Sequence, residues 1–117
     1  MKAVLLISHG SQSPKTKQEV QALVKKLEEK SGIPIFEYAF LEIESPNIPE
    51  GIDRCVKKAA SEIVVLLNFL NSGRHVDMDI PNIIDAARKK YPKIPIRISR
   101  PVGQAEGIAD LFLKMIS

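Results

Sequence analysis

The chain has 117 residues and a mass of 13.0 kDa, so we expect residues 1–117 to form a single domain. Hydrophobic residues make up 44% and charged residues 26%, which excludes intrinsic disorder, and the single cysteine excludes a disulfide framework. The net charge of +3 is spread along the chain and favours a small anionic ligand over nucleic acid. No apolar run reaches the roughly 18 residues of a membrane span, and the start has no cleavable signal pattern. We therefore expect a soluble cytoplasmic protein with no membrane partner.

The first half of the chain alternates apolar runs with a helical period. Residues 3–7 are a continuous apolar run, which is typical of a strand buried on both faces. Ser13-Pro14 supplies an N-cap and a first helical residue, and Gly32 supplies a helix end. Between them a helical stripe is formed by Val20, Leu23, Val24 and Leu27. A second strand is predicted over residues 33–41.

The second helix is predicted from Asn47, with Glu50 three residues later as in a capping box. Its apolar face consists of Ile48, Ile52, Cys55, Val56 and Ala59, so we interpret Cys55 as a core residue. The apolar, β-branched run over residues 63–67 predicts the third strand.

The remaining pattern predicts a third helix, a fourth strand and a last helix. The third helix has the stripe Ile80, Ile83, Ile84 and Ala87, and Asp77 and Asp79 are interpreted as acids that cap its N-terminus. Residues 94–98 alternate apolar with Pro95 and Arg97, which predicts an edge strand because proline cannot donate in a central ladder. The last helix is marked by Ile108, Leu111, Phe112 and Met115.

Four β–α units predict an α/β fold: a three-layer α/β/α arrangement with a four-stranded parallel sheet joined by right-handed crossovers. The expected strand order is 2-1-3-4, a flavodoxin-like winding shortened by one strand. The chain reverses direction between strands 1 and 3, so the loops that leave these strands border a crevice. Ligands of open α/β sheets bind in this crevice.

The only two histidines of the chain fall on those two loops. His9 follows the first strand and His75 follows the third, while Glu42 lies just past the neighbouring second strand. Two imidazoles and a carboxylate at an open cleft can hold a divalent transition metal and leave coordination positions free. Each histidine could instead be a hydrogen-bonding loop residue, and either Glu42 or nearby Glu44 could be a solvated charge.

Four further residues on these loops are predicted to contact a substrate: Ser11, Lys15, Gly73 and Arg74. The cations, together with Lys17 and Arg100, could pair with carboxylates, although surface charge is the ordinary role of such residues. Gly10 and the serines around it could form a phosphate cradle at a helix N-terminus. No nucleotide-binding glycine motif accompanies them. Phosphate-ester chemistry at the His9 loop is therefore kept as one hypothesis beside metal binding.

Two segments carry longer motifs. The first is Leu5-Leu6-Ile7-Ser8-His9-Gly10-Ser11, and the second is Phe69-Leu70-Asn71-Ser72-Gly73-Arg74-His75-Val76-Asp77-Met78-Asp79-Ile80-Pro81. They resemble the small CbiX-type class II chelatases, the sirohydrochlorin chelatases, whose second motif is F-L-x-x-G-x-H-x-x-x-D-I-P. Phe40-Leu41-Glu42 and Arg100-Pro101-Val102-Gly103 follow in the same order as in that family. Asn68 stands where many relatives have proline, and no histidine-rich segment is present.

The resemblance implies a chelatase-like half-domain that inserts cobalt, or nickel, into sirohydrochlorin on the way to cobalamin or coenzyme F430. The family's metal-binding histidines correspond to His9 and His75, and Glu42 matches an acidic position that assists catalysis. The short form implies a homodimer. The metal would be a substrate, no cofactor would be permanently bound, and no ATP site is expected. Nickelochelatase or ferrochelatase activity is a further option within the family, and a non-catalytic tetrapyrrole or metal carrier using the same cleft is the alternative.

Overall fold

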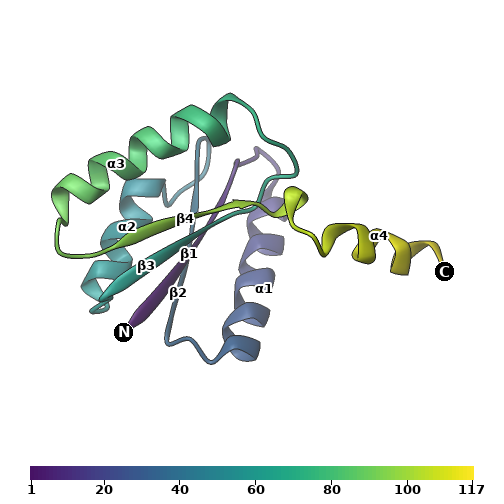
Figure 1. Ribbon diagram of the computed structural model, residues 1–117, viewed down its shortest axis with the longest axis horizontal. Helices are drawn as coiled ribbons and strands as arrows, with labels where there is room; N and C mark the ends of the chain where they lie inside the picture. The colour runs from purple at the N-terminus through teal and green to yellow at the C-terminus, as the bar shows by residue number, and fades with distance from the viewer.

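The sheet of the computed structural model, which describes residues 1–117, has four parallel strands (Figure 1). They are β1 (Lys2–Ser8), β2 (Ile35–Phe40), β3 (Glu62–Leu67) and β4 (Ile96–Pro101). Their order is β2-β1-β3-β4, and every neighbouring pair is parallel. The predicted strand order is confirmed, and β1 and β3 are the two central strands whose loops border the switch point.

Helices cover both faces of this sheet, as predicted. Helix α1 (Pro14–Ser31) lies on one face, and α2 (Ile48–Lys57) and α3 (Ile80–Lys90) lie on the other (Figure 1). Successive residues of a strand point to opposite faces. Accordingly, Ala3, Leu5 and Ile7 belong to the larger core cluster beneath α2 and α3, while Val4 and Leu6 belong to the smaller cluster beneath α1. Burial on both faces explains why residues 3–7 of β1 are all apolar.

Local signals set the helix boundaries. Pro14 opens α1 after Ser13, although the Ser13 side chain makes no capping bond. Gly32 ends this helix in the left-handed conformation, with φ 69°. At the start of α2, Asn47 Oδ1 accepts from the Glu50 N–H and Glu50 Oε1 accepts from the Asn47 N–H, both at 2.9 Å. The predicted capping box is therefore complete.

Several predicted boundaries differ from the structure. Strand β4 begins at Ile96 rather than residue 94, because the Ile94 N–H donates to the Tyr91 carbonyl in a turn at 3.1 Å. Strand β2 is shorter than predicted at both ends. Helix α2 ends at Lys57, so Ala59 is not on its apolar face: Ala59 is exposed with φ 70°, and the next residue, Ala60, is buried in its place.

The last helix, α4 (Ile108–Ile116), forms where predicted but does not cover the sheet. It follows a short 3₁₀ turn, η2 (Val102–Gln104), and extends away from the sheet as the yellow arm of Figure 1. None of its residues is buried. Neither α4 nor any other helix combines the length and the apolar character needed to cross a membrane.

Candidate metal centre

The ladder between β1 and β2 continues past both strands and brings Glu42 beside His9. The Leu41 N–H donates to the Ser8 carbonyl at 2.9 Å, and the Glu42 N–H donates to the His9 carbonyl at 3.1 Å. The two loops therefore run together beyond the sheet edge. As a result, Oε1 of Glu42 lies 2.6 Å from Nε2 of His9.

Gly10 makes this close approach sterically feasible. Its φ is +106°, and a Cβ atom added to it would lie 1.9 Å from the Glu42 carbonyl oxygen. A side chain at this position would push the two loops apart and strain the backbone. The glycine after His9 is thus required by the neighbouring Glu42 loop.

His75 reaches the same place from the end of β3. The Asn68 N–H donates to the Ile7 carbonyl at 2.8 Å, and Asn68 Nδ2 donates to Oγ of the buried Ser8 at 3.0 Å. These bonds fasten the start of the β3 loop to the end of β1. The loop then enters a π-helical turn, η1 (His75–Asp79), that leads into α3. The His9 and His75 rings end with their centroids 5.3 Å apart, tilted by 49°.

His9, Glu42 and His75 together form a three-residue cluster able to hold a metal ion. Each offers one ligand atom, and these atoms all lie within 4.8 Å of one another. Two imidazole nitrogens and one carboxylate oxygen suit cobalt, nickel, iron or zinc, and three protein ligands leave further positions open. The residues that sequence reasoning selected from three different loops therefore do meet.

The second nitrogen of each ring has its own partner. Nδ1 of His75 lies 2.8 Å from Oδ2 of Asp79, and Nδ1 of His9 lies 3.2 Å from the Gly10 carbonyl oxygen. Because both oxygens accept, we assign a proton to each Nδ1, which leaves Nε2 for a metal. The interpretation of Asp79 as a capping acid is wrong, because its side chain makes no capping bond. The i,i+4 spacing of His75 and Asp79 within a helical turn was the signal for this contact.

The cluster is open to solvent. The side chains of His9, Glu42 and His75 are 46%, 50% and 47% exposed. An ion pair this exposed contributes only about 0–1 kcal/mol to folding, so fold stability does not account for the convergence of these groups. The exposure gives a large ligand direct access to a bound ion.

The other predicted contact residues surround the cluster without joining it. Lys15 is exposed in the first turn of α1, while Gly73 and Arg74 are exposed immediately before His75. The N–H of Ser11 donates to Glu44 Oε2 at 3.1 Å. Glu44 therefore binds the backbone of the loop after β1, and Glu42 is the carboxylate that faces His9.

The Glu44 contact also bears on the phosphate-cradle hypothesis. A phosphate cradle needs backbone N–H groups free to donate to an anion. At Ser11 this donor is taken by a carboxylate, and Ser11 Oγ accepts from the Ser13 N–H at 3.0 Å. The geometry of the loop therefore favours a metal-binding site over a phosphate-binding site.

Cys55 lies outside the site, as predicted. It is fully buried in the larger core cluster. Burial raises the pKa of its thiol to about 12, and the nearby Glu37 carboxylate contributes to the same rise. A thiol held neutral among apolar side chains does not act as a thiolate ligand or nucleophile.

Comparisons with known proteins identify the family of this chain. The family model described as CbiX matches residues 3–117. A sirohydrochlorin cobaltochelatase of Priestia megaterium is 38% identical over 112 residues, covering 96% of this chain and 36% of the relative. A sirohydrochlorin ferrochelatase of the same organism is 30% identical over 117 residues, covering all of this chain and 44% of the relative.

A solved structure is also similar. It is the sirohydrochlorin chelatase SirB from Bacillus subtilis subspecies spizizenii in complex with cobalt, with a TM-score of 0.87 and 33% identity. The match covers 98% of this chain and 50% of that one. The chain thus spans about half the length, or less, of these three relatives.

Proposed function

The chain belongs to the CbiX family, and from this premise we propose that it is a sirohydrochlorin chelatase that inserts Co²⁺, or Ni²⁺, into sirohydrochlorin without ATP. One observation carries the proposal: His9, Glu42 and His75 offer three ligand atoms within 4.8 Å of one another at an open edge of the sheet. The metal is a substrate, so it must be bound loosely enough to leave. Three ligands with open positions meet this need better than a closed cage.

Metal capture begins by displacing a proton. Without a cation, the short contact between His9 Nε2 and Glu42 Oε1 is a hydrogen bond with one proton between the two atoms. A divalent ion that binds both atoms takes the place of this proton, which is released. His75 completes the set through Nε2, while Asp79 holds its Nδ1–H.

Metal transfer returns one proton to the same pair of groups. Insertion removes two protons from the pyrrole nitrogens as these nitrogens replace the protein ligands on the ion. We assign the first proton to Glu42, whose carboxylate is freed beside the macrocycle when the ion leaves. Glu42 shares this proton with His9 Nε2, which restores the hydrogen-bonded pair and prepares the site for the next ion. The second proton passes to water at the open cluster. No nucleotide is needed, because the stability of the metal–macrocycle product drives the step.

The macrocycle has an apolar face and a rim of carboxylates, and the loops around the cluster offer partners for both. Ile43 directly follows Glu42, and Met78 lies one turn after His75; both side chains are more than half exposed. We assign these two residues to the face of the ring. Ser11, Lys15, Gly73 and Arg74 are assigned to the rim, where Lys and Arg pair with carboxylates.

Cobalt is the metal we favour. The cobaltochelatase of Priestia megaterium is 38% identical to this chain and the ferrochelatase of that organism is 30% identical. Nickel binds imidazole sites more tightly than cobalt, so metal supply as well as ligand type decides the physiological ion. A side-by-side assay with Co²⁺, Ni²⁺ and Fe²⁺ tests the choice, and cobalt should give the fastest insertion.

We also propose that the chain works as a cytoplasmic homodimer in cobalamin synthesis. The support is length: the relatives above are at least twice as long as the segment this chain matches. A second copy would supply the other half.

The decisive assay for the reaction is turnover. Sirohydrochlorin and Co²⁺ are supplied in large excess over protein, and insertion is followed by the absorbance change of the macrocycle. A chelatase converts many equivalents. Conversion that stops at one equivalent per site would instead support a tetrapyrrole or metal carrier.

A further inference from the structure

Helix α4 carries large apolar side chains around almost its whole circumference. These side chains are 54–81% exposed: Leu111, Phe112, Leu113, Met115 and Ile116. Only Asp110 and Lys114, one turn apart, provide a polar face. A helix that is apolar nearly all round is ordinarily buried, and exposed apolar patches mark interaction surfaces. We therefore expect α4 to pack against another apolar surface.

The same chain has an open apolar groove on the face of the sheet that carries α1. The groove has a volume of about 650 Å³ and lies between α1 and β4. Its lining includes Leu6, Leu23, Leu27 and Leu66, with Arg97 and Arg100 of β4 beside them. Leu23 is 38% exposed although it lies on the core-facing side of α1, one turn before Leu27. This part of the sheet face has no helix over it.

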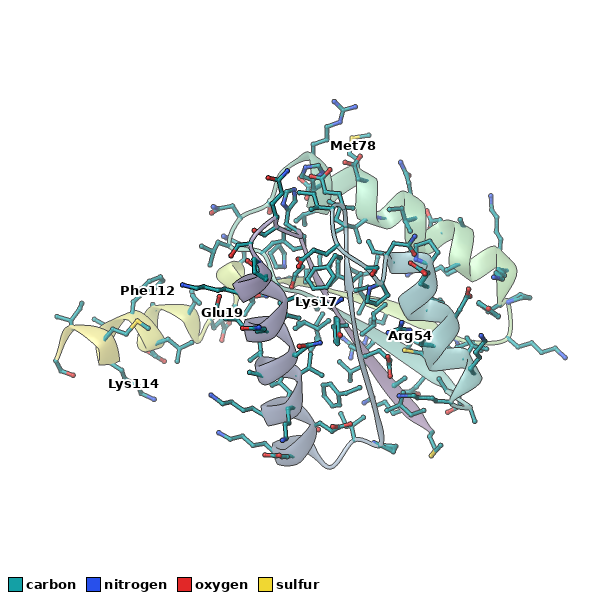
Figure 2. The ribbon with its side chains drawn as sticks, turned by 180° about the vertical axis from the view of Figure 1, so that it is seen from behind. Lys17, Glu19, Arg54, Met78, Phe112 and Lys114 are labelled. Carbon is teal, nitrogen blue, oxygen red and sulfur yellow. The ribbon has the colours of Figure 1, made fainter.

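The connection from β4 holds α4 away from this groove. Turn η2 is packed against the β3 loop: a Cβ on Gly103 would lie 1.9 Å from the Leu70 carbonyl oxygen, and Gln104 Nε2 donates to that oxygen at 3.0 Å. Only three residues separate η2 from α4, and the Ile108 N–H donates to the Ala105 carbonyl at 3.2 Å across them. Figure 2 shows the result, with Phe112 and Lys114 on an arm well outside the layers formed by the rest of the chain.

We propose that α4 of one copy packs into the α1–β4 groove of a second copy, and the reverse, in a dimer with twofold symmetry. The chain holds this unpartnered apolar helix and the α1–β4 groove apart. Reciprocal exchange satisfies both in each copy, and short connections favour such exchange. Charge agrees as well, because Glu106, two residues before α4, and Asp110, in its first turn, can meet Arg97 and Arg100 in the groove.

This inference deepens the homodimer of the proposed function and rests on it, but it does not depend on the chelatase reaction. It is tested by a disulfide between two chains. One full-length variant carries Leu27→Cys in the groove and the other carries Phe112→Cys in α4. Cys55 stays in place because it is fully buried. The two variants are co-expressed, oxidised gently and analysed by mass spectrometry, so any disulfide between positions 27 and 112 must join different chains.

We expect a disulfide between position 27 of one chain and position 112 of the other and, for the unmodified protein, a light-scattering mass of twice 13.0 kDa. Lys25→Cys, on another face of α1, replaces Leu27→Cys as the matched control and should not cross-link to position 112. Two results would overturn the inference. They are a bridge only between two copies of position 112, or a dimer with no bridge between positions 27 and 112. A light-scattering mass of a monomer would contradict the proposed homodimer as well as its mode of packing.

Discussion

Nε2 of His9 and Oε1 of Glu42 lie 2.6 Å apart at the end of a backbone ladder that extends past β1 and β2. This contact places a carboxylate and an imidazole where one small cation can touch both. The His75 ring, 5.3 Å from that of His9, adds the third ligand from another strand end. The pair therefore has two states, proton-bridged and metal-bridged, and the proposed cycle moves between them.

Replacement of Glu42 by glutamine should separate its two roles. The amide keeps an oxygen that can face a metal but cannot accept a pyrrole proton. We expect kcat for cobalt insertion to fall about 10²–10⁴-fold, the usual contribution of general acid–base catalysis. Cobalt affinity, measured by calorimetric titration, should change less. The matched control is Glu44→Gln, which removes a charge that binds Ser11 rather than His9. Equal losses in both variants would argue against a specific role for Glu42.

Replacement of Asp79 by asparagine should weaken metal binding through His75. The carboxylate accepts from Nδ1 at 2.8 Å and so fixes the ring with Nε2 toward the cluster. Loss of such an outer partner ordinarily costs about 10–100-fold in metal affinity or activity. Asp77→Asn, two residues away on the same turn and without a bond to the ring, is the control. The expectation fails if cobalt affinity is the same in the two variants.

Substitution of Gly10 by alanine should damage both the fold and the site. A methyl group would overlap the Glu42 carbonyl oxygen, and φ is +106°. Gly32→Ala is a matched control, because Gly32 also has positive φ, +69°, but has no atom within 4 Å of the added Cβ. We expect a loss of about 1 kcal/mol in the free energy of unfolding for Gly32→Ala and about 3 kcal/mol for Gly10→Ala. Denaturant titration measures both, and similar losses would exclude the close approach as the cause.

The sequence predicts most of the fold because the signals for it are local. A strand buried on both faces is continuous in apolar residues, and the Asn47–Glu50 capping box marks a helix start within four residues. The position of α4 could not be predicted in this way. Its apolar stripe predicts a helix but does not say which surface the stripe packs against.

The sequence predicts only part of the site, because most of its contacts join residues far apart in the chain. His9 and His75 could be chosen because topology brings the two loops together. Glu42 could not be distinguished from Glu44, since the choice depends on how the ladder continues beyond β2. Asn68 departs from the family motif, and the motif does not indicate that its amide donates to the buried Ser8 hydroxyl. Contacts between side chains far apart in the chain leave no periodic pattern.

Cys55 predicts how stability depends on pH at the alkaline end. Its pKa rises from an ordinary value of 9.0 to about 12 on folding, so the folded state favours the neutral thiol. This contribution is fully present below pH 9 and is lost as pH rises toward 12, by about 1 kcal/mol per pH unit. The difference in unfolding free energy between the wild type and Cys55→Ala should therefore shrink above pH 9. A difference that stays constant across this alkaline range would contradict the prediction.

In the proposed reaction, His9 and His75 bind one metal ion and pass it to a tetrapyrrole. The most direct measurement is the rate of cobalt insertion into excess sirohydrochlorin by His9→Ala and His75→Ala, with circular dichroism to verify the fold. Asn71→Ala, an exposed change in the same loop as His75, is the control. We expect losses of about 100-fold or more in each histidine variant and a wild-type rate in the control. A folded His75→Ala protein that turns over at the wild-type rate would contradict this expectation.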